Sequence, residues 1–85
     1  MPNVNKEDLL QRITINPKIM VGKPVIRGMR ITVEQILEAL AAGVTEQELL
    51  EDYPVLESDD IKAVLLYANE LVKEERVYLV NLGDK

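Results

Sequence analysis

The chain has 85 residues, of which 47% are hydrophobic and 29% charged, and its formal net charge is −5. This composition is typical of one globular domain rather than of a disordered segment. The chain contains no Cys and no His, which excludes disulfides, thiolate nucleophiles, Ser–His–Asp triads and the commonest metal ligands. We therefore expect a cytoplasmic, non-catalytic binding protein with no cofactor, no metal and no membrane span.

Positive and negative charges are separated along the chain. The stretch from residue 9 to residue 33 has no carboxylate and carries five cations, which are Arg12, Lys18, Lys23, Arg27 and Arg30. The segment 34–75 holds 12 carboxylates and two lysines, which leaves it at −10. The two parts either attract each other within the fold, or they form two faces for two partners or one dipolar face that pairs with a second copy.

The N-terminal third predicts a short helix followed by a β-hairpin arm. Asn5 can cap a helix that runs from Lys6 to about Gln11. The run Ile13-Thr14-Ile15 alternates as a strand does, and glycines bracket a second extended segment further on. We interpret residues 13–31 as a small two-stranded hairpin, which must lie on helices or on a partner chain because a lone hairpin is marginal in water.

Two capping boxes mark the starts of the next two helices. Thr32 with Gln35 predicts a helix over 32–42 that ends at Gly43 in a left-handed conformation. Thr45 with Glu48 predicts a second helix over 45–52, which stops before Pro54.

The third and longest helix is predicted over 58–75, with Ser58 as its cap. One core stripe at helical spacing comprises Ile61, Val64, Leu65, Ala68, Leu71 and Val72. From Arg76 on, the β-branched and aromatic residues favour an extended tail. The predicted fold is mainly α: a tri-helical helix-turn-helix core over 32–75, a helix and β arm over 1–31, and a tail over 76–85.

An apolar patch remains outside this core, formed by Leu66, Tyr67, Tyr78 and Leu79. One exposed leucine on a helix needs no explanation, but four large apolar side chains together form a patch that is normally covered. We therefore expect a homodimer, or the docking of another chain, at these residues.

DNA binding by the three helices meets an electrostatic objection. The third helix would be the recognition helix, yet it begins with Asp59-Asp60, which a polyanion repels. If DNA is bound, the candidate contacts are the arm cations Lys18, Lys23, Arg27 and Arg30. Arg27 and Arg30 also have a structural interpretation, as internal ion pairs with Glu34, Asp59 or Asp60.

The segment INPKIMVGKPVIRGMRITV, from Ile15 to Val33, resembles the family labelled domain of unknown function 433. The segments ILEALAAG (36–43), EDYP (51–54) and DDIKA (59–63) are also similar to that family. Met29 departs from the family pattern, which usually has Thr between the glycine and the arginine. The resemblance implies a bacterial or archaeal protein with a homeodomain-like fold, and some members look like antitoxins of VapBC-type pairs whose toxins are PIN-like ribonucleases.

Three functions are weighed on this basis. The first is an antitoxin that neutralises a PIN-like ribonuclease, either by covering its basic RNA groove or by inserting Arg76 or Lys85 of the tail into its carboxylate-lined metal site. The alternative is a helix-turn-helix transcriptional autoregulator that binds operator DNA through the basic arm. A magnesium-dependent enzyme based on Glu48, Glu51 and Asp52 is disfavoured, because acidic residues on a helix usually form a solvated face.

Overall fold

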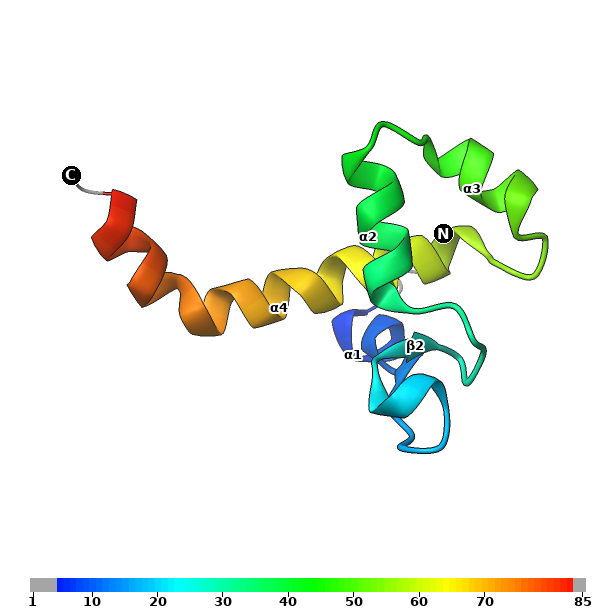
Figure 1. Ribbon diagram of the computed structural model, residues 1–85, viewed down its shortest axis with the longest axis horizontal. Coiled ribbons are helices and arrows are strands. Elements are labelled where there is room, and N and C mark those ends of the chain that lie inside the picture. The colour runs from blue at the N-terminus through cyan, green and yellow to red at the C-terminus, as the bar shows by residue number, and fades with distance from the viewer. Residues whose placement is uncertain (1–4, 84–85) are drawn as a thin grey trace.

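The computed structural model describes residues 5–83, with side chains for residues 5–74. Its elements in chain order are α1 (Lys6–Leu10), β1 (Ile13–Thr14), a 3₁₀ turn (Met20–Gly22), β2 (Val25–Ile26), α2 (Val33–Ala41), α3 (Glu46–Asp52) and α4 (Ser58–Gly83). The arm and the last three helices form a body from which the C-terminal part of α4 projects (Figure 1). The mainly helical fold with a short hairpin near the N-terminus is as predicted.

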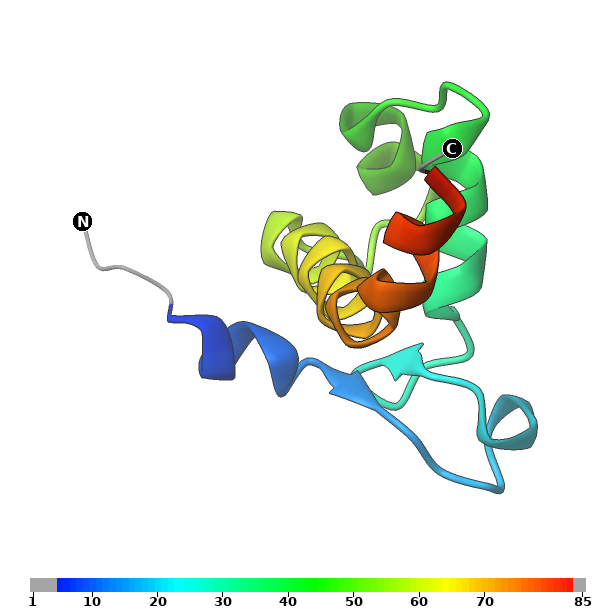
Figure 2. The same cartoon turned by 90° about the vertical axis from the view of Figure 1, so that its left-hand side faces the viewer.

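The two strands pair antiparallel, with Ile13 opposite Ile26 and Thr14 opposite Val25. Val25 also forms a β-bridge to Thr32, so the arm leads directly into the first turn of α2. Figure 2, which views the first part of α4 nearly end-on, shows the arm on one side of that part and α2 and α3 on the others. The hairpin thus lies on helices of its own chain, which supplies the burial that an isolated hairpin lacks.

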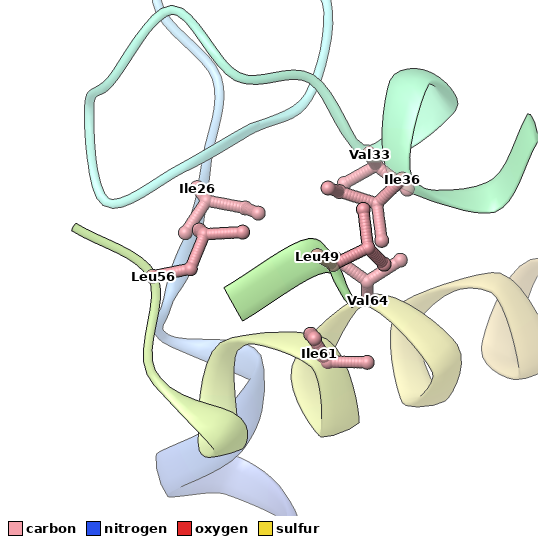
Figure 3. Close-up of a cluster of buried hydrophobic side chains, with 7 residues drawn as sticks. All are labelled: Ile26, Val33, Ile36, Leu49, Leu56, Ile61 and Val64. Atoms are coloured by element: carbon pink, nitrogen blue, oxygen red, sulfur yellow. The ribbon is translucent and has the colours of Figure 1, made fainter. Parts of the chain in front are cut away.

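One apolar cluster connects the arm to all three following helices (Figure 3). Its buried members are Ile26, Val33, Ile36, Leu49, Leu56, Ile61 and Val64. Each such side chain contributes about 1.5–3 kcal/mol when it is fully removed from water. Ile26 is the member that the arm supplies, so the arm is part of the core and not a free appendage.

Local capping fixes the ends of α2 and the start of α3, as the sequence predicts. Both capping boxes form, and the hydroxyls of Thr32 and Thr45 accept from the backbone amides of Gln35 and Glu48 at 3.0 and 3.1 Å. Gly43 has φ +99° at the end of α2, and the N–H of Val44 donates to the carbonyl of Ala39 at 3.0 Å. This geometry is the Schellman motif, which satisfies the last carbonyls of a helix.

The start of α4 differs from the prediction that Ser58 is its cap. Ser58 is the first residue of α4, and its hydroxyl donates to Oε2 of Glu46 at 2.8 Å. The backbone N–H before it, that of Glu57, donates instead to the carboxylate of Asp60 at 2.8 Å. At the start of α4, the buried carboxylate of Asp60 thus accepts from a backbone N–H that has no partner within the helix.

The end of α4 also differs, because the backbone stays helical to Gly83 where an extended tail was expected from Arg76 on. Strong helix formers occupy 73–76, no Pro or Gly interrupts the segment before Gly83, and extending a formed helix is much easier than starting one. The predicted core stripe is buried only in its first part, at Ile61 and Val64. Leu65, Leu71 and Val72 are 50%, 47% and 50% exposed, so the stripe continues beyond the body.

Candidate functional site

A buried carboxylate at the start of α4 joins the arm to the helices. The side chain of Asp60 is fully buried. Its Oδ1 accepts from Nη1 of Arg12 at 2.9 Å and from Nε of Arg27 at 3.0 Å. Its Oδ2 accepts from Nη2 of Arg27 and from the backbone N–H of Glu57, both at 2.8 Å. Four donors and two opposite charges compensate the burial of this charge.

A tight turn places Arg27 beside Asp60. Arg27 and Gly28 have φ values of +47° and +74°, and the N–H of Met29 donates to the carbonyl of Ile26 at 2.8 Å. Two successive positive φ values are the pattern of a type I′ turn. The left-handed conformation costs a non-glycine residue about 1–2 kcal/mol. The ion pair of Arg27 offsets this cost, as does a 2.8 Å bond from its Nη2 to the carbonyl of Val55.

The network remains ionised at neutral pH. Burial by itself would raise the pKa of Asp60, but the hydrogen bonds from Arg27, from the N–H of Glu57 and from Arg12 together outweigh burial, and the pKa lies below its ordinary value. The hydrogen bond to Asp60 raises the pKa of Arg27, and hydrogen bonds to Glu57 and Asp60 raise that of Arg12. The start of α4 is thus closed by charges that satisfy one another.

The cations predicted for DNA or partner contacts fall into two groups. Lys23 and Arg27 are paired internally, and Nζ of Lys23 lies 2.9 Å from Oε1 of Glu34. Lys18 and Arg30 are exposed and form no ion pair with any side chain of residues 5–74. The internal ion pair expected for Arg27 is confirmed. That expected for Arg30 is wrong, because Arg30 Nη1 lies 4.0 Å from Sδ of Met20 instead.

Arg12 belongs to the network although its sequence context did not single it out. Its Nη1 lies 2.8 Å from Oε1 of Glu57, and its Nη2 lies 3.9 Å from Oδ2 of Asp59. Strand pairing brings it to this place, since its carbonyl accepts from the N–H of Arg27 at 2.7 Å. The one sequence feature that could have indicated this role is the position of Arg12 directly before the predicted strand at Ile13.

An apolar groove lies between α2 and α4 in the described part of the chain. It has a volume of about 290 Å³ and is lined by Lys23, Pro24, Val33, Glu34, Leu37, Glu38, Tyr67 and Leu71. The side chains of α2 and α4 form its apolar walls. The Lys23–Glu34 ion pair stands at its rim, and the hydrogen bond to Glu34 raises the pKa of Lys23. Such a groove accepts an apolar side chain of a partner while its rim stays hydrated.

The predicted interface residues do not form one patch. Tyr67 is half-buried against the core and lines the groove, together with Lys23 from the predicted cation set. Leu66 is half-buried and lies one helical turn before Glu70, whose Oε2 is 2.9 Å from Nζ of Lys6 in α1. Leu66 thus shares the α1 side of α4. The side chains of Tyr78 and Leu79, like those of the tail residues Arg76 and Lys85, lie outside the described part of the chain.

The described residues contain neither a membrane-spanning helix nor a cluster of metal ligands. Within residues 5–83, no helix has the length and apolar character that crossing a bilayer requires. Among the side chains of residues 5–74, no group of three or more acidic residues is arranged to hold a metal ion, and this includes Glu48, Glu51 and Asp52 of α3.

The family model described as "Protein of unknown function (DUF433)" matches residues 13–68. The chain belongs to the DUF433 family. The match covers both strands of the arm, α2, α3 and the first part of α4. It therefore includes the Arg27–Asp60 pair and most of the groove, whereas Arg12 lies one residue before it. In this DUF433 protein, α1 and the projecting part of α4 lie outside the matched region.

A curated relative and a solved structure are similar to this DUF433 protein. The relative is the uncharacterized protein y4eO of Sinorhizobium fredii, 35% identical over 68 residues, which are 78% of this chain and 31% of y4eO. The chain thus spans about a third of that protein's length. The solved structure is a crystal structure of a DUF433 member from Anabaena variabilis, with a TM-score of 0.69 and 24% identity over 91% of this chain and 86% of the other. At that identity the similarity shows a shared fold.

Proposed function

We propose that this DUF433 protein is a non-catalytic, cytoplasmic protein-binding module: the antitoxin of a VapBC-like pair that neutralises a PIN-like ribonuclease by direct contact. The observation that carries the proposal is the open apolar groove between α2 and α4. Concave apolar surfaces on a small domain are typical of sites that bind another molecule. The polar groups at the start of α4, unlike the groove, already have partners within the chain, because Asp60 binds Arg12, Arg27 and the backbone N–H of Glu57.

The surface charge suits a basic partner. Three of the five arm cations, Arg12, Lys23 and Arg27, are neutralised by carboxylates within the fold. The carboxylates of α3 (Glu46, Glu48, Glu51 and Asp52) are exposed and form no ion pair within residues 5–74. A ribonuclease must hold a polyanion, so its substrate groove is basic, and an acidic inhibitor is steered to such a groove.

The test has two steps. The first looks for a PIN-like ribonuclease gene beside the gene of this chain, and the second is co-purification with that ribonuclease and measurement of its RNase rate. We expect the wild-type chain to bind the nuclease and to lower this rate. Leu37→Lys places a charge in the groove wall from α2 and should weaken binding at least tenfold. Circular dichroism of the free variant verifies that it folds.

Val55→Lys is the matched control, because Val55 is an exposed apolar residue that does not line the groove. It should bind as the wild type does. An unchanged RNase rate with the wild-type chain, or equal losses in the two variants, contradicts the proposal.

A second candidate function is DNA binding through the arm, and Lys18 and Arg30 are the observation in its favour, since both are exposed without an ion-pair partner in residues 5–74. Two phosphate contacts predict a slope of about −2 for log K against log salt in a gel-shift titration with operator DNA. Lys18→Ala with Arg30→Ala should remove the shift, whereas Lys62→Ala on α4 should not. No shift at low salt contradicts this function.

A further inference from the structure

The C-terminal part of α4 has little of its own chain to pack on. The helix has 26 residues, which corresponds to a length of about 39 Å. Its orange and red part, from about residue 70 on, projects away from the body in Figure 1. Packing supplies most helical stability in proteins, and this part of α4 extends beyond the body in which the helix begins. A partner surface would add such packing to the projecting part.

The sequence of α4 repeats every seven residues. Apolar residues recur at alternating spacings of three and four, at Ile61, Val64, Ala68, Leu71, Tyr78 and Leu82, and the repeat is interrupted once, at Glu75. A second row with the same seven-residue period flanks this repeat, at Leu65, Val72 and Leu79. A strict seven-residue period is that of a left-handed coiled-coil seam, whereas an isolated helix follows 3.6 residues per turn.

The structure shows where this repeat changes its role. Ile61 and Val64 are buried in the core of their own chain. Leu71, one heptad after Val64, is 47% exposed, and its neighbour Val72 is 50% exposed. The helical backbone carries the same register on to Gly83. The stripe thus serves the core in its first heptad, and at Leu71 and Val72 it is half exposed and open to another helix.

We propose that the projecting part of α4 pairs antiparallel with the same segment of a second copy, in a seam that shares Leu71 with the groove of the function above. A second copy offers the same seven-residue period, which a seam requires of both helices. In the antiparallel register, Leu71 lies opposite Leu82 of the other copy, and Glu75 lies opposite Tyr78.

The charge at Glu75 selects the orientation. In a parallel pair, the two copies of Glu75 occupy one layer of the seam, and like charges at such a position are destabilising. In the antiparallel pair, Glu75 shares its layer with Tyr78 of the other copy and not with a second carboxylate, and a phenol can donate a hydrogen bond. The antiparallel pair also sets the two acidic bodies at opposite ends of the seam.

Sedimentation equilibrium over a concentration series tests the pairing. We expect a monomer–dimer equilibrium in the wild-type chain, and Leu79→Glu should raise the dimer Kd at least tenfold. The matched control is Val80→Glu, one residue on and outside the repeat, which should leave the Kd within about twofold. Glu75→Leu should tighten the dimer. A chain that stays monomeric at every concentration overturns the proposal, and this is the result expected if the segment binds only another protein. Equal effects of the substitutions at residues 79 and 80 also overturn it.

Cysteine cross-linking tests the orientation, with no background because the chain has no Cys. Leu71→Cys and Leu82→Cys are made as separate proteins, one with an affinity tag, and oxidised alone and mixed. The antiparallel register predicts a disulfide in the mixture and none in either protein alone, since a disulfide needs Cα atoms about 4.4–6.8 Å apart. Cross-links in each protein alone indicate a parallel pair and overturn the proposed register. Binding of the ribonuclease by Leu79→Glu distinguishes failure of this pairing from failure of the proposed function.

Discussion

Arg27 and Asp60 are 33 residues apart in the sequence and are joined by two hydrogen bonds, from Nε to Oδ1 at 3.0 Å and from Nη2 to Oδ2 at 2.8 Å. The pair connects the turn of the arm to the first turn of α4. This pair explains why Arg27 adopts a left-handed backbone conformation before Gly28, and why an aspartate is buried at the start of the longest helix. The stability of the arm and that of the helices are therefore coupled through one carboxylate.

Asp60→Asn should lower the free energy of unfolding by about 2–3 kcal/mol, since both arginines lose their charged partner in a buried position. The expected loss lies below the range of about 3–5 kcal/mol for fully buried pairs, because the two arginine side chains are partly exposed. Urea denaturation measures the change. Asp59→Asn is the matched control: Asp59 is the next residue, partly exposed and 3.9 Å from Arg12, so its replacement should cost less than about 1 kcal/mol. Equal losses at the two positions contradict the assigned role of Asp60.

Acid should destabilise the protein through the same carboxylate. The pKa of Asp60 is lower in the folded chain than in the unfolded one, so the unfolded state takes up a proton first as the pH falls. The contribution of Asp60 is complete above the ordinary carboxyl pKa of about 3.9 and is lost as the pH drops below it. Glu70, whose pKa is lowered mainly by the hydrogen bond from Lys6, acts in the same direction.

Urea unfolding of the wild type and of Asp60→Asn at several pH values isolates the Asp60 contribution. The difference in unfolding free energy should be constant near neutral pH and should shrink as the pH falls below about 4. A difference that does not change with pH shows that Asp60 does not titrate as described.

Val21→Gly should stabilise the fold by about 0.5–1 kcal/mol. Val21 has φ +58° and is 93% exposed, so a β-branched residue occupies a left-handed position without any burial in return. Glycine relieves a cost of about 1–2 kcal/mol at such a position, and part of the gain is lost because glycine gives the unfolded chain more freedom. Thermal unfolding followed by circular dichroism measures the change. Val55→Gly, at an exposed valine without a positive φ, should instead lower the stability.

Gly43→Ala should lower the free energy of unfolding by about 1 kcal/mol. A Cβ at Gly43 would meet no atom within 4 Å, so the cost is the φ of +99° alone. The measurement is again urea denaturation. A neutral or stabilising effect would mean that the end of α2 does not depend on the left-handed conformation.

Features that depend on a few neighbouring residues are predictable from the sequence. The two capping boxes and Gly43 locate α2 and α3 to within a residue, because a threonine hydroxyl reaches only backbone amides of its own first turn. The hairpin is likewise indicated by the strand at Ile13 and the glycines that follow. Attraction between the arm and the helices is one of the interpretations that the charge separation allows, and three ion pairs of Arg12, Lys23 and Arg27 agree with it.

Features that depend on distant segments were decided by the tertiary structure. Arg27 pairs with Asp60 and Arg30 does not, because the turn at Gly28 directs these two side chains to different places. Tyr67 and Leu66 are neighbours in sequence, yet one lines the groove and the other shares the α1 side, since helices pack on both sides of α4. The sequence by itself determined both ends of α2 and the start of α3, since capping is local. The capping of α4 and its extent to Gly83 were not predicted. Which faces are covered and which charges meet depended on contacts between segments tens of residues apart, which local patterns do not encode.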